Sequence, residues 1–294
     1  MHNETIMATS TIEITTLNRP ARVDRGWRLF VRGILARAYP RVIGQMREKL
    51  WIFIETFLPF LATVGYVFVY RAIQAPEDYV GFVVIGGAMT AFWLNVIWMM
   101  ASQLYWEKSS GNLPLYIIAP NSLMSILLGM AFGGLLATLL RAGAIVILGT
   151  WMFGIQFQVT SFFELFAVFA LTMAALYGLG MMLASVFLLF GREAWQIADA
   201  LREPVYFVSG FYFPVRALGF PVALAASVLP MTLGLDAMRQ LSFSNGPTLG
   251  FLTIGVEIGI LAALTVLFGI GAKIALEVVE RKAIEEGTLT DRNR

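Results

Sequence analysis

Residues 122–155 read SLMSILLGMAFGGLLATLLRAGAIVILGTWMFGI, a run in which Arg141 is the one charged side chain. A bilayer core about 30 Å thick needs about 20 consecutive apolar residues in a helix. The run exceeds that length and is also too long for a helix or strand of a soluble core. It predicts a membrane-spanning helix that tilts or projects from the bilayer.

Similar apolar blocks occur on both sides of this run. They lie at about 50–70, 80–104, 162–190, 203–230 and 248–271. The composition agrees with a lipid environment, because 58% of the residues are apolar and only 14% are charged, against about 25% charged in soluble domains. The sequence therefore predicts an all-α polytopic membrane protein with six transmembrane helices.

The 203–230 block differs from the others because four prolines interrupt it, namely Pro204, Pro214, Pro221 and Pro230. Proline removes a helix hydrogen bond and clashes with the preceding turn. We expect one spanning helix here, followed by short re-entrant helices in an extracellular region at 211–246.

Lysine and arginine positions predict the orientation. With both termini in the cytoplasm, 17 of the 21 basic residues lie on the inner side, and Arg71, Arg216 and Arg239 lie outside. Such an excess follows the positive-inside rule. The segment 105–121 then faces the cytoplasm, and 71–79 and 211–246 face outward.

The remaining segments divide around the 50–271 transmembrane domain. Residues 1–21 predict a disordered cytoplasmic tail and 272–294 a cytoplasmic C-terminal tail. Between 22 and 49, apolar residues alternate with arginines at helical spacing, which predicts an amphipathic interfacial helix divided at Pro40. The alternative is a positive anchor that only sets topology.

Several kinds of chemistry lack their residues in this chain. It has no cysteine, and His2 is its one histidine, so we predict no catalytic residue and no metal site. No GxxxxGK[ST] phosphate loop occurs, and a net charge of +2 gives no basis for binding nucleic acid. Any ATP-hydrolysing motor must be another chain.

Three charged residues fall within the apolar blocks: Glu55, Arg141 and Glu257. Each costs about 2.5–3.5 kcal/mol to insert, so we expect Arg141 to pair with a carboxylate or to face an internal path. Which carboxylate it pairs with is left open by the sequence. The GxxxG pairs Gly129–Gly133 and Gly255–Gly259 predict close helix packing.

The segment 105–121 holds the strongest local pattern. Charged Glu107 and Lys108 precede a break at Gly111, an apolar turn around Leu115 and a stop at Pro120. This order predicts a short amphipathic helix presented to a soluble partner. A tight loop on the lipid surface is the alternative.

These residues carry a resemblance to a known family. Glu107, then Gly111-Asn112-Leu113 and Ala119-Pro120, followed by Ser209–Pro214, Leu229–Thr232 and Leu235–Arg239, resemble the permease subunits of type-2 ABC exporters. Asn112 and Ala119 depart from the threonine and serine usual in that family. The resemblance covers roughly residues 28–275.

The resemblance implies a subunit that is not itself an enzyme. Two separate ATP-binding subunits would hold ATP and Mg, with no cofactor in this chain, and a second copy of it or a similar permease would complete the complex in the membrane. Coupling to the ATPase would involve Glu107, Lys108, Gly111, Leu115 and Pro120. An extracellular gate region would comprise Phe211, Tyr212, Phe213, Pro214 and Pro230.

The implied function is outward transport across the bacterial cytoplasmic membrane. The implied substrate is a lipid, a lipid-linked glycan or an amphipathic drug. An ion-gradient-driven secondary carrier or channel, or a structural membrane subunit, is the alternative.

Overall fold

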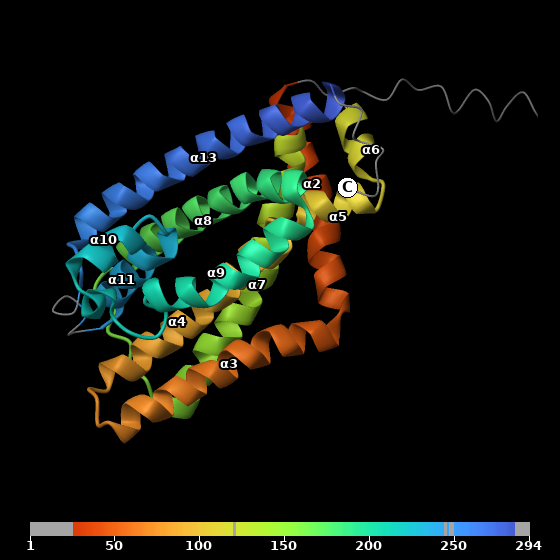
Figure 1. Cartoon of the computed structure of the whole chain (residues 1–294). Coiled ribbons are helices and arrows are strands. Elements are labelled where there is room, and N and C mark those ends of the chain that lie inside the picture. The colour runs from red at the N-terminus through yellow and green to blue at the C-terminus, as the bar shows by residue number, and fades with distance from the viewer. Residues whose placement is uncertain (1–25, 120–121, 244–245, 247–249, 286–294) are drawn as a thin grey trace, which may run out of the picture.

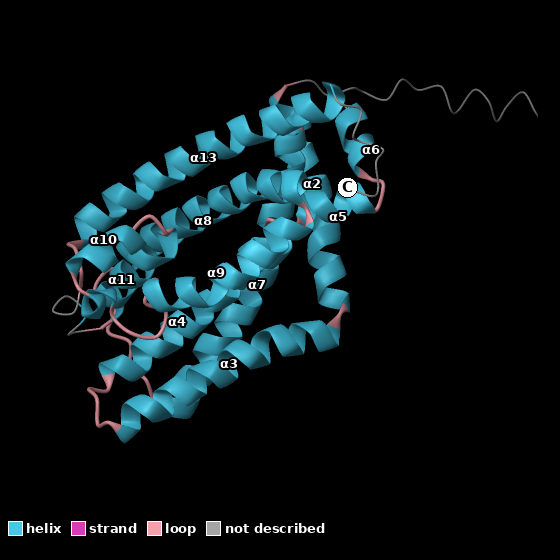
Figure 2. Ribbon diagram, in the orientation of Figure 1, coloured by secondary structure: helices cyan, strands magenta, loops and turns pink. Residues whose placement is uncertain are grey.

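The computed structural model describes residues 26–119, 122–243, 246 and 250–285. This part of the chain is helical and contains no strand, as Figure 2 shows. The all-α prediction is confirmed. The predicted N-terminal tail at 1–21, the part of the predicted C-terminal tail beyond residue 285, and Pro120 of the coupling segment lie outside the described residues. Residues 272–285, which were predicted to belong to the C-terminal tail, continue helix α13.

The helices follow one another with short connections. In chain order they are α2 (Trp27–Arg47), α3 (Lys49–Ala72), α4 (Asp78–Leu94), the π-helix η1 (Asn95–Met100), α5 (Gln103–Ser109), α6 (Leu113–Ile118), α7 (Leu123–Phe153), α8 (Phe162–Phe190), α9 (Arg192–Val208), the 3-10 helix η2 (Val215–Leu218), α10 (Phe220–Ala226), α11 (Pro230–Ser242) and α13 (Ile254–Glu285).

Five of the described helical segments are long and apolar enough to span a membrane: α3, α4 with η1 and α5, α7, α8, and α13. A sixth is counted if α10 and α11, bent by 113° at their junction, form one span. This bend agrees with the predicted re-entrant helices. Figure 1 also shows α9 running from the end of the molecule at α5 toward the end at α10 and α11.

The fifth apolar block was placed incorrectly by the sequence. The helix there begins at Arg192, ahead of the predicted start of the block at about 203, and ends at Val208, before the predicted re-entrant region at 211–246. Five charged residues of α9 reduce its apolar content, namely Arg192, Glu193, Asp199, Arg202 and Glu203. The most apolar stretch in this part of the sequence therefore lies in the re-entrant region and not in α9.

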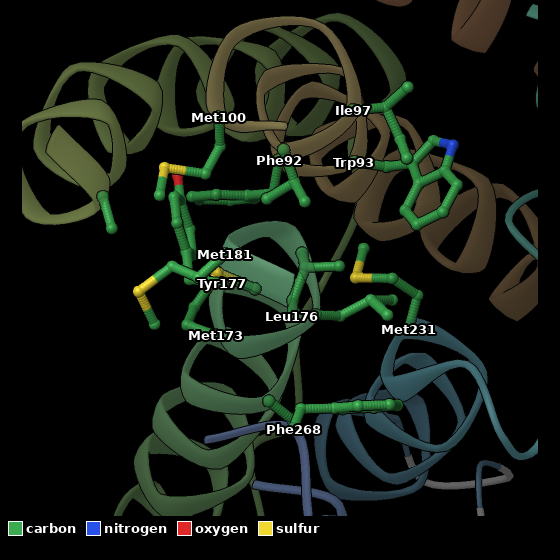
Figure 3. Packing of buried hydrophobic residues seen from close by; sticks show 14 of the residues in the cluster. Phe92, Trp93, Ile97, Met100, Met173, Leu176, Tyr177, Met181, Met231 and Phe268 are labelled. Carbon is green, nitrogen blue, oxygen red and sulfur yellow. The ribbon is translucent and has the colours of Figure 1, made fainter. Parts of the chain in front are cut away.

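The core is built around α4, which is almost wholly buried, whereas α3 and α13 leave most of their surfaces uncovered. Figure 3 shows Phe92 of α4, Leu176 of α8 and Phe268 of α13 packed in one cluster. Helix α4 is apolar around its whole circumference, as expected of a helix that has apolar neighbours on every side. The uncovered surfaces of α3 and α13 remain available to lipid or to another subunit.

Helix α2 packs along the first half of α7. A Cβ at Gly129 would come within 2.5 Å of the Ile34 carbonyl oxygen, and one at Gly133 within 2.8 Å of the Ala38 carbonyl oxygen. The predicted packing role of this GxxxG pair is confirmed. At Gly255 and Gly259 it is not, because a Cβ there would meet nothing within 4 Å in the described chain.

Pro40 does not divide the interfacial helix as predicted. α2 continues through it from Trp27 to Arg47, and the chain turns at Glu48, where φ is −88° and ψ is 70°. The contacts with α7 continue beyond the proline, because Gly133 packs against Arg41. Packing on α7 therefore supports the helix where its hydrogen-bond ladder lacks one donor.

Candidate functional site

The segment between the second and third spans folds as two short helices, α5 and α6, at one end of the molecule (Figure 1). Residues 110–112 form the turn between them. Gly111 has a φ of +76°, in the left-handed region that glycine enters without steric cost. The predicted break at Gly111 is confirmed, and the segment contains two helical pieces.

The carboxylate of Glu107 is buried and joins α2, α5 and α6. It forms an ion pair with Arg37 of α2. It also accepts hydrogen bonds from Gln103 Nε2 at 3.0 Å, Asn112 Nδ2 at 3.0 Å and the Tyr116 hydroxyl at 3.1 Å. One guanidinium and three neutral donors satisfy both carboxylate oxygens. Glu107 therefore fixes the position of the α5–α6 turn relative to α2.

This geometry corrects the predicted contact of Glu107 with a partner protein. The residue is only 6% exposed, and its donors all come from this chain. The sequence pattern identified Glu107 but not the direction of its side chain, because its partner Arg37 lies 70 positions away in the sequence. From the sequence, Arg37 was recognised only as one of the arginines of the predicted amphipathic helix at 22–49.

Tyr116 contributes a neutral donor to this cluster. Burial raises the pKa of its phenol above the ordinary value, and the positive charge of Arg37 partly opposes that rise. The phenol therefore remains protonated near neutral pH and donates to Glu107. The same Arg37 guanidinium lies 5.2 Å from the centre of the Tyr116 ring.

The outward face of the segment is apolar and hydroxyl-bearing. Trp106 is 53% exposed and Leu115 is 64% exposed. Ser109 and Ser110 are exposed as well, while Lys108 is half-buried. Exposed large apolar side chains on a short structured segment are typical of a protein contact.

Arg141 and Glu55 form an ion pair between α7 and α3. Arg141 is buried, and its Nη2 also donates to Gln45 Oε1 of α2 at 3.3 Å. The prediction that Arg141 is paired is confirmed, and Glu55 is the carboxylate that the sequence left open. The pair ties the first span to the third on the side where α2 packs.

Arg239 organises the opposite end of the molecule. Its Nη1 donates to the carbonyl oxygens of Gly210 at 2.7 Å and Phe213 at 3.3 Å. Its Nη2 donates to Phe211 at 2.7 Å and to Phe82 of α4 at 3.0 Å. One guanidinium thus holds the loop after α9 against α4.

A second buried polar group lies beside it, between α11 and the first turn of α13. Gln240 Nε2 lies 3.0 Å from Asp236 Oδ2, 2.9 Å from the Leu252 carbonyl oxygen and 3.3 Å from Glu257 Oε2. Glu257 is fully buried. It therefore belongs to a polar contact at the end of the bundle where α11 lies and does not pair with Arg141.

The predicted gate residues surround the loop that Arg239 holds. Phe211, Pro214 and Pro230 are buried, and Tyr212 and Phe213 are partly buried. Tyr212 stacks on Tyr66 of α3 with ring centres 4.0 Å apart, and its carbonyl oxygen accepts from the Tyr70 hydroxyl at 3.0 Å. The gate residues thus form one packed unit that joins α3, α4 and α11.

The family of the chain follows from comparison with known proteins. Residues 32–243 match the family model described as ABC-2 type transporter. The chain belongs to this family. None of the curated proteins matches it.

As an ABC-2 permease, the chain is a transmembrane subunit of an ABC transporter that pairs with an ATP-binding subunit. The matched range contains Glu107, Arg141 and Arg239, whereas Glu257 lies beyond its end. From the sequence, Arg239 was considered only as one of the basic residues predicted to lie outside the membrane. The available signal was the spacing of Asp236, Arg239 and Gln240, which places three polar groups on one side of an otherwise apolar helix.

Replacing Arg141 with leucine is expected to lower both the stability of the ABC-2 permease and its transport. The substitution leaves Glu55 without its cation and Gln45 without a donor, at a cost of about 2–4 kcal/mol for a pair in which one partner is buried. Thermal unfolding of the purified protein in detergent measures the loss. The double variant Glu55→Leu/Arg141→Leu should recover part of it, because no unpaired charge remains. Unchanged unfolding and transport in Arg141→Leu would contradict a role for the pair.

Proposed function

We propose that the chain is the permease of an ATP-driven exporter that moves a lipid, a lipid-linked glycan or an amphipathic drug outward. The observation that carries this proposal is the α5–α6 segment, which is anchored internally through Glu107 and presents Trp106 and Leu115 outward. Such a segment suits the transmission of a partner's movement. Displacing its outer face also moves α2, which contacts both α7 and α3.

The power source in this proposal is a pair of separate ATP-binding subunits, which hold ATP and Mg. Support comes from the missing phosphate loop in this sequence and from the family's pairing with an ATP-binding subunit. A second copy of the chain, or a similar permease, completes the membrane part. The uncovered surfaces of α3 and α13 provide room for that copy and for lipid.

The proposed location is the bacterial cytoplasmic membrane, with both termini inside. Support comes from the 17 basic residues that this arrangement places on the inner side. α5 and α6 then face the cytoplasm, and α10 and α11 face outward.

Labelling of Ser110→Cys tests this orientation. The native chain has no cysteine, and Ser110 is exposed in the turn between α5 and α6. We expect a membrane-impermeant maleimide to react only after the cells are opened, whereas Phe220→Cys on α10, a matched exposed position, should react in intact cells. Reaction of Ser110→Cys in intact cells would reverse the topology.

The motor is tested by purifying the tagged chain from its host and identifying the proteins that remain bound. We expect an ATP-binding subunit whose hydrolysis rises when the complex is reconstituted in lipid. The control is Leu115→Asp, which places a charge on the proposed docking face and leaves the buried Glu107 cluster intact. Recovery of the chain with no ATPase, under conditions that preserve its fold, would overturn the proposal in favour of the carrier or structural alternatives.

A further inference from the structure

A cavity of about 360 Å³ lies where α2 and the start of α3 face η1 and α5. Figure 1 shows α2 crossing the end of the bundle at which α5 lies, whereas α3, α8 and α13 run along the bundle. A basic amphipathic helix that crosses the ends of membrane spans lies at the level of the lipid headgroups. The cavity is therefore at that level, and its volume is within the range of about 300–1,000 Å³ that small-molecule sites enclose.

Arg41 of α2 lines this cavity and has no carboxylate partner in the described part of the chain. Its one hydrogen bond to those residues runs from Nη2 to the Met99 carbonyl oxygen of η1 and is long, at 3.5 Å. The buried Nε atom has no acceptor there. Nη1 has none either but, unlike Nε, it remains accessible. The guanidinium can therefore donate to an anion that enters the cavity.

The surroundings of Arg41 oppose its positive charge. Burial lowers the pKa of Arg41 below its ordinary value, and the positive charge of Arg37 one turn away adds to this effect. A guanidinium nevertheless stays protonated in proteins. Arg37 is itself neutralised by Glu107 in an ion pair, whereas Arg41 is a poorly hydrated charge without a counter-ion. An anion from outside the chain would stabilise it.

A second carboxylate, that of Glu48, also lines the wall. It lies in the turn between α2 and α3, where it is exposed and where salt screens its charge. Its two neighbours in the sequence, Arg47 and Lys49, are exposed cations. These two positive charges outnumber the one carboxylate, and Arg41 adds a third. The junction as a whole therefore favours an anionic ligand.

The start of α3 offers a surface for acyl chains beside this polar cavity. Helix α3 begins at Lys49 and is long and apolar enough to span a membrane. In its first turns Leu50 is 73% exposed and Phe53 is 59% exposed. A phospholipid can use both features, with its phosphate at Arg41 and its chains along α3. Inorganic phosphate would use only the first.

We propose that this cavity binds the phosphate group of an anionic phospholipid as a bound component of the permease. The phosphate oxygens accept hydrogen bonds from Arg41, and the acyl chains lie along Leu50 and Phe53. Gly44, on the same wall, leaves room for the group, because a Cβ there would meet nothing within 4 Å in the described chain. This binding is independent of the proposed function, since it requires neither a motor nor a transported molecule.

The test uses the full chain in detergent and measures the Kd of the first bound lipid by native mass spectrometry. The probes are phosphatidylglycerol and phosphatidylcholine with identical acyl chains, and we expect phosphatidylglycerol to bind several-fold more tightly because of its net negative charge. Arg41→Gln should weaken phosphatidylglycerol binding about tenfold, as expected for a lost hydrogen bond to a charged group. Arg28→Gln, at an exposed position of α2 outside the wall, should change the Kd less than twofold.

A second pair of variants tests the cavity without changing a charge. Gly44→Phe places a ring at the wall, where nothing in the described chain obstructs its Cβ. Gly65→Phe is the matched control, at an exposed glycine of α3 that is equally unobstructed and lies outside the wall. We expect at least fivefold weaker phosphatidylglycerol binding in Gly44→Phe and native binding in Gly65→Phe.

Three results would overturn the proposal. Native binding in Arg41→Gln or in Gly44→Phe would place the bound lipid elsewhere. Equal affinity of the native chain for the two lipids would contradict the anionic class. Displacement of phosphatidylglycerol by soluble sn-glycerol 3-phosphate would identify a site for free phosphate compounds in place of a lipid. Because no ATPase is present, a failure of the proposed motor pairing leaves these results unaffected.

Discussion

Replacing Glu107 with lysine is expected to abolish ATP-driven transport while the membrane helices remain inserted. The new ammonium would face Arg37 and three hydrogen-bond donors where a carboxylate now lies. Breaking a buried ion pair costs about 3–5 kcal/mol, and the partial exposure of Arg37 reduces this to about 2–3 kcal/mol. That energy is enough to release α5 and α6 from α2 without unfolding the whole bundle.

The measurement is ATP hydrolysis and transport by the reconstituted complex, and both should fall at least tenfold. Glu107→Gln keeps the acceptor oxygen and should retain a larger share of activity. Arg37→Glu combined with Glu107→Lys restores opposite charges and should recover part of the loss. Glu277→Lys on α13 makes the same charge change at an exposed site and should have little effect. Full activity in Glu107→Lys would mean that the segment is a passive connector.

The Glu107 cluster shows how far the sequence could lead. The pattern of charge, glycine and proline at 105–121 was sufficient to predict a structured segment between two spans, because Gly111 and the short apolar run act locally. The direction of the Glu107 side chain depends on Arg37, which another helix supplies. No local spacing contains that information.

The α2–α7 contact has the same explanation. Gly129 and Gly133 indicated a close approach, and their partners are Ile34 and Ala38 of a helix far away in the sequence. These contacts join residues of α2 and α7 that are about 95 positions apart in the sequence, and the same separation pairs Gln45 with Arg141. Arg141 was predictable as a paired residue from its cost in lipid, but Glu55 became its partner only through the arrangement of three helices.

Apolar windows were least informative after α8. They combined the end of α9 with the re-entrant helices, because α9 carries several charges while α10 is mainly apolar. The role of Arg239 in the same region was also missed, because a count of charges treats it as one more cation in a loop. Its position in the last turn of a buried 13-residue helix gives it a different function.

Replacing Arg239 with methionine is expected to be the most destabilising single change in the half of the protein that contains α10 and α11. The guanidinium donates to carbonyl oxygens of Phe82, Gly210, Phe211 and Phe213. None of the three loop oxygens accepts a backbone hydrogen bond from the described residues. Each buried acceptor left unsatisfied costs about 1–3 kcal/mol, so we expect a loss of about 3–5 kcal/mol in the free energy of unfolding.

The loop is expected to separate from α4 in this variant before the rest of the bundle unfolds. Tyr70 still donates to Tyr212, but that single bond leaves the carbonyl oxygens on either side without donors. Hydrogen exchange followed by mass spectrometry should therefore show faster exchange in peptides covering 209–214, with α8 unchanged. Arg239→Lys keeps the charge but cannot reach four oxygens with one ammonium, so it should resemble Arg239→Met. Lys273→Met, at an exposed cation, is the matched control. Native-like exchange at 209–214 in both Arg239 variants would show that stacking of Tyr212 on Tyr66 alone holds the loop.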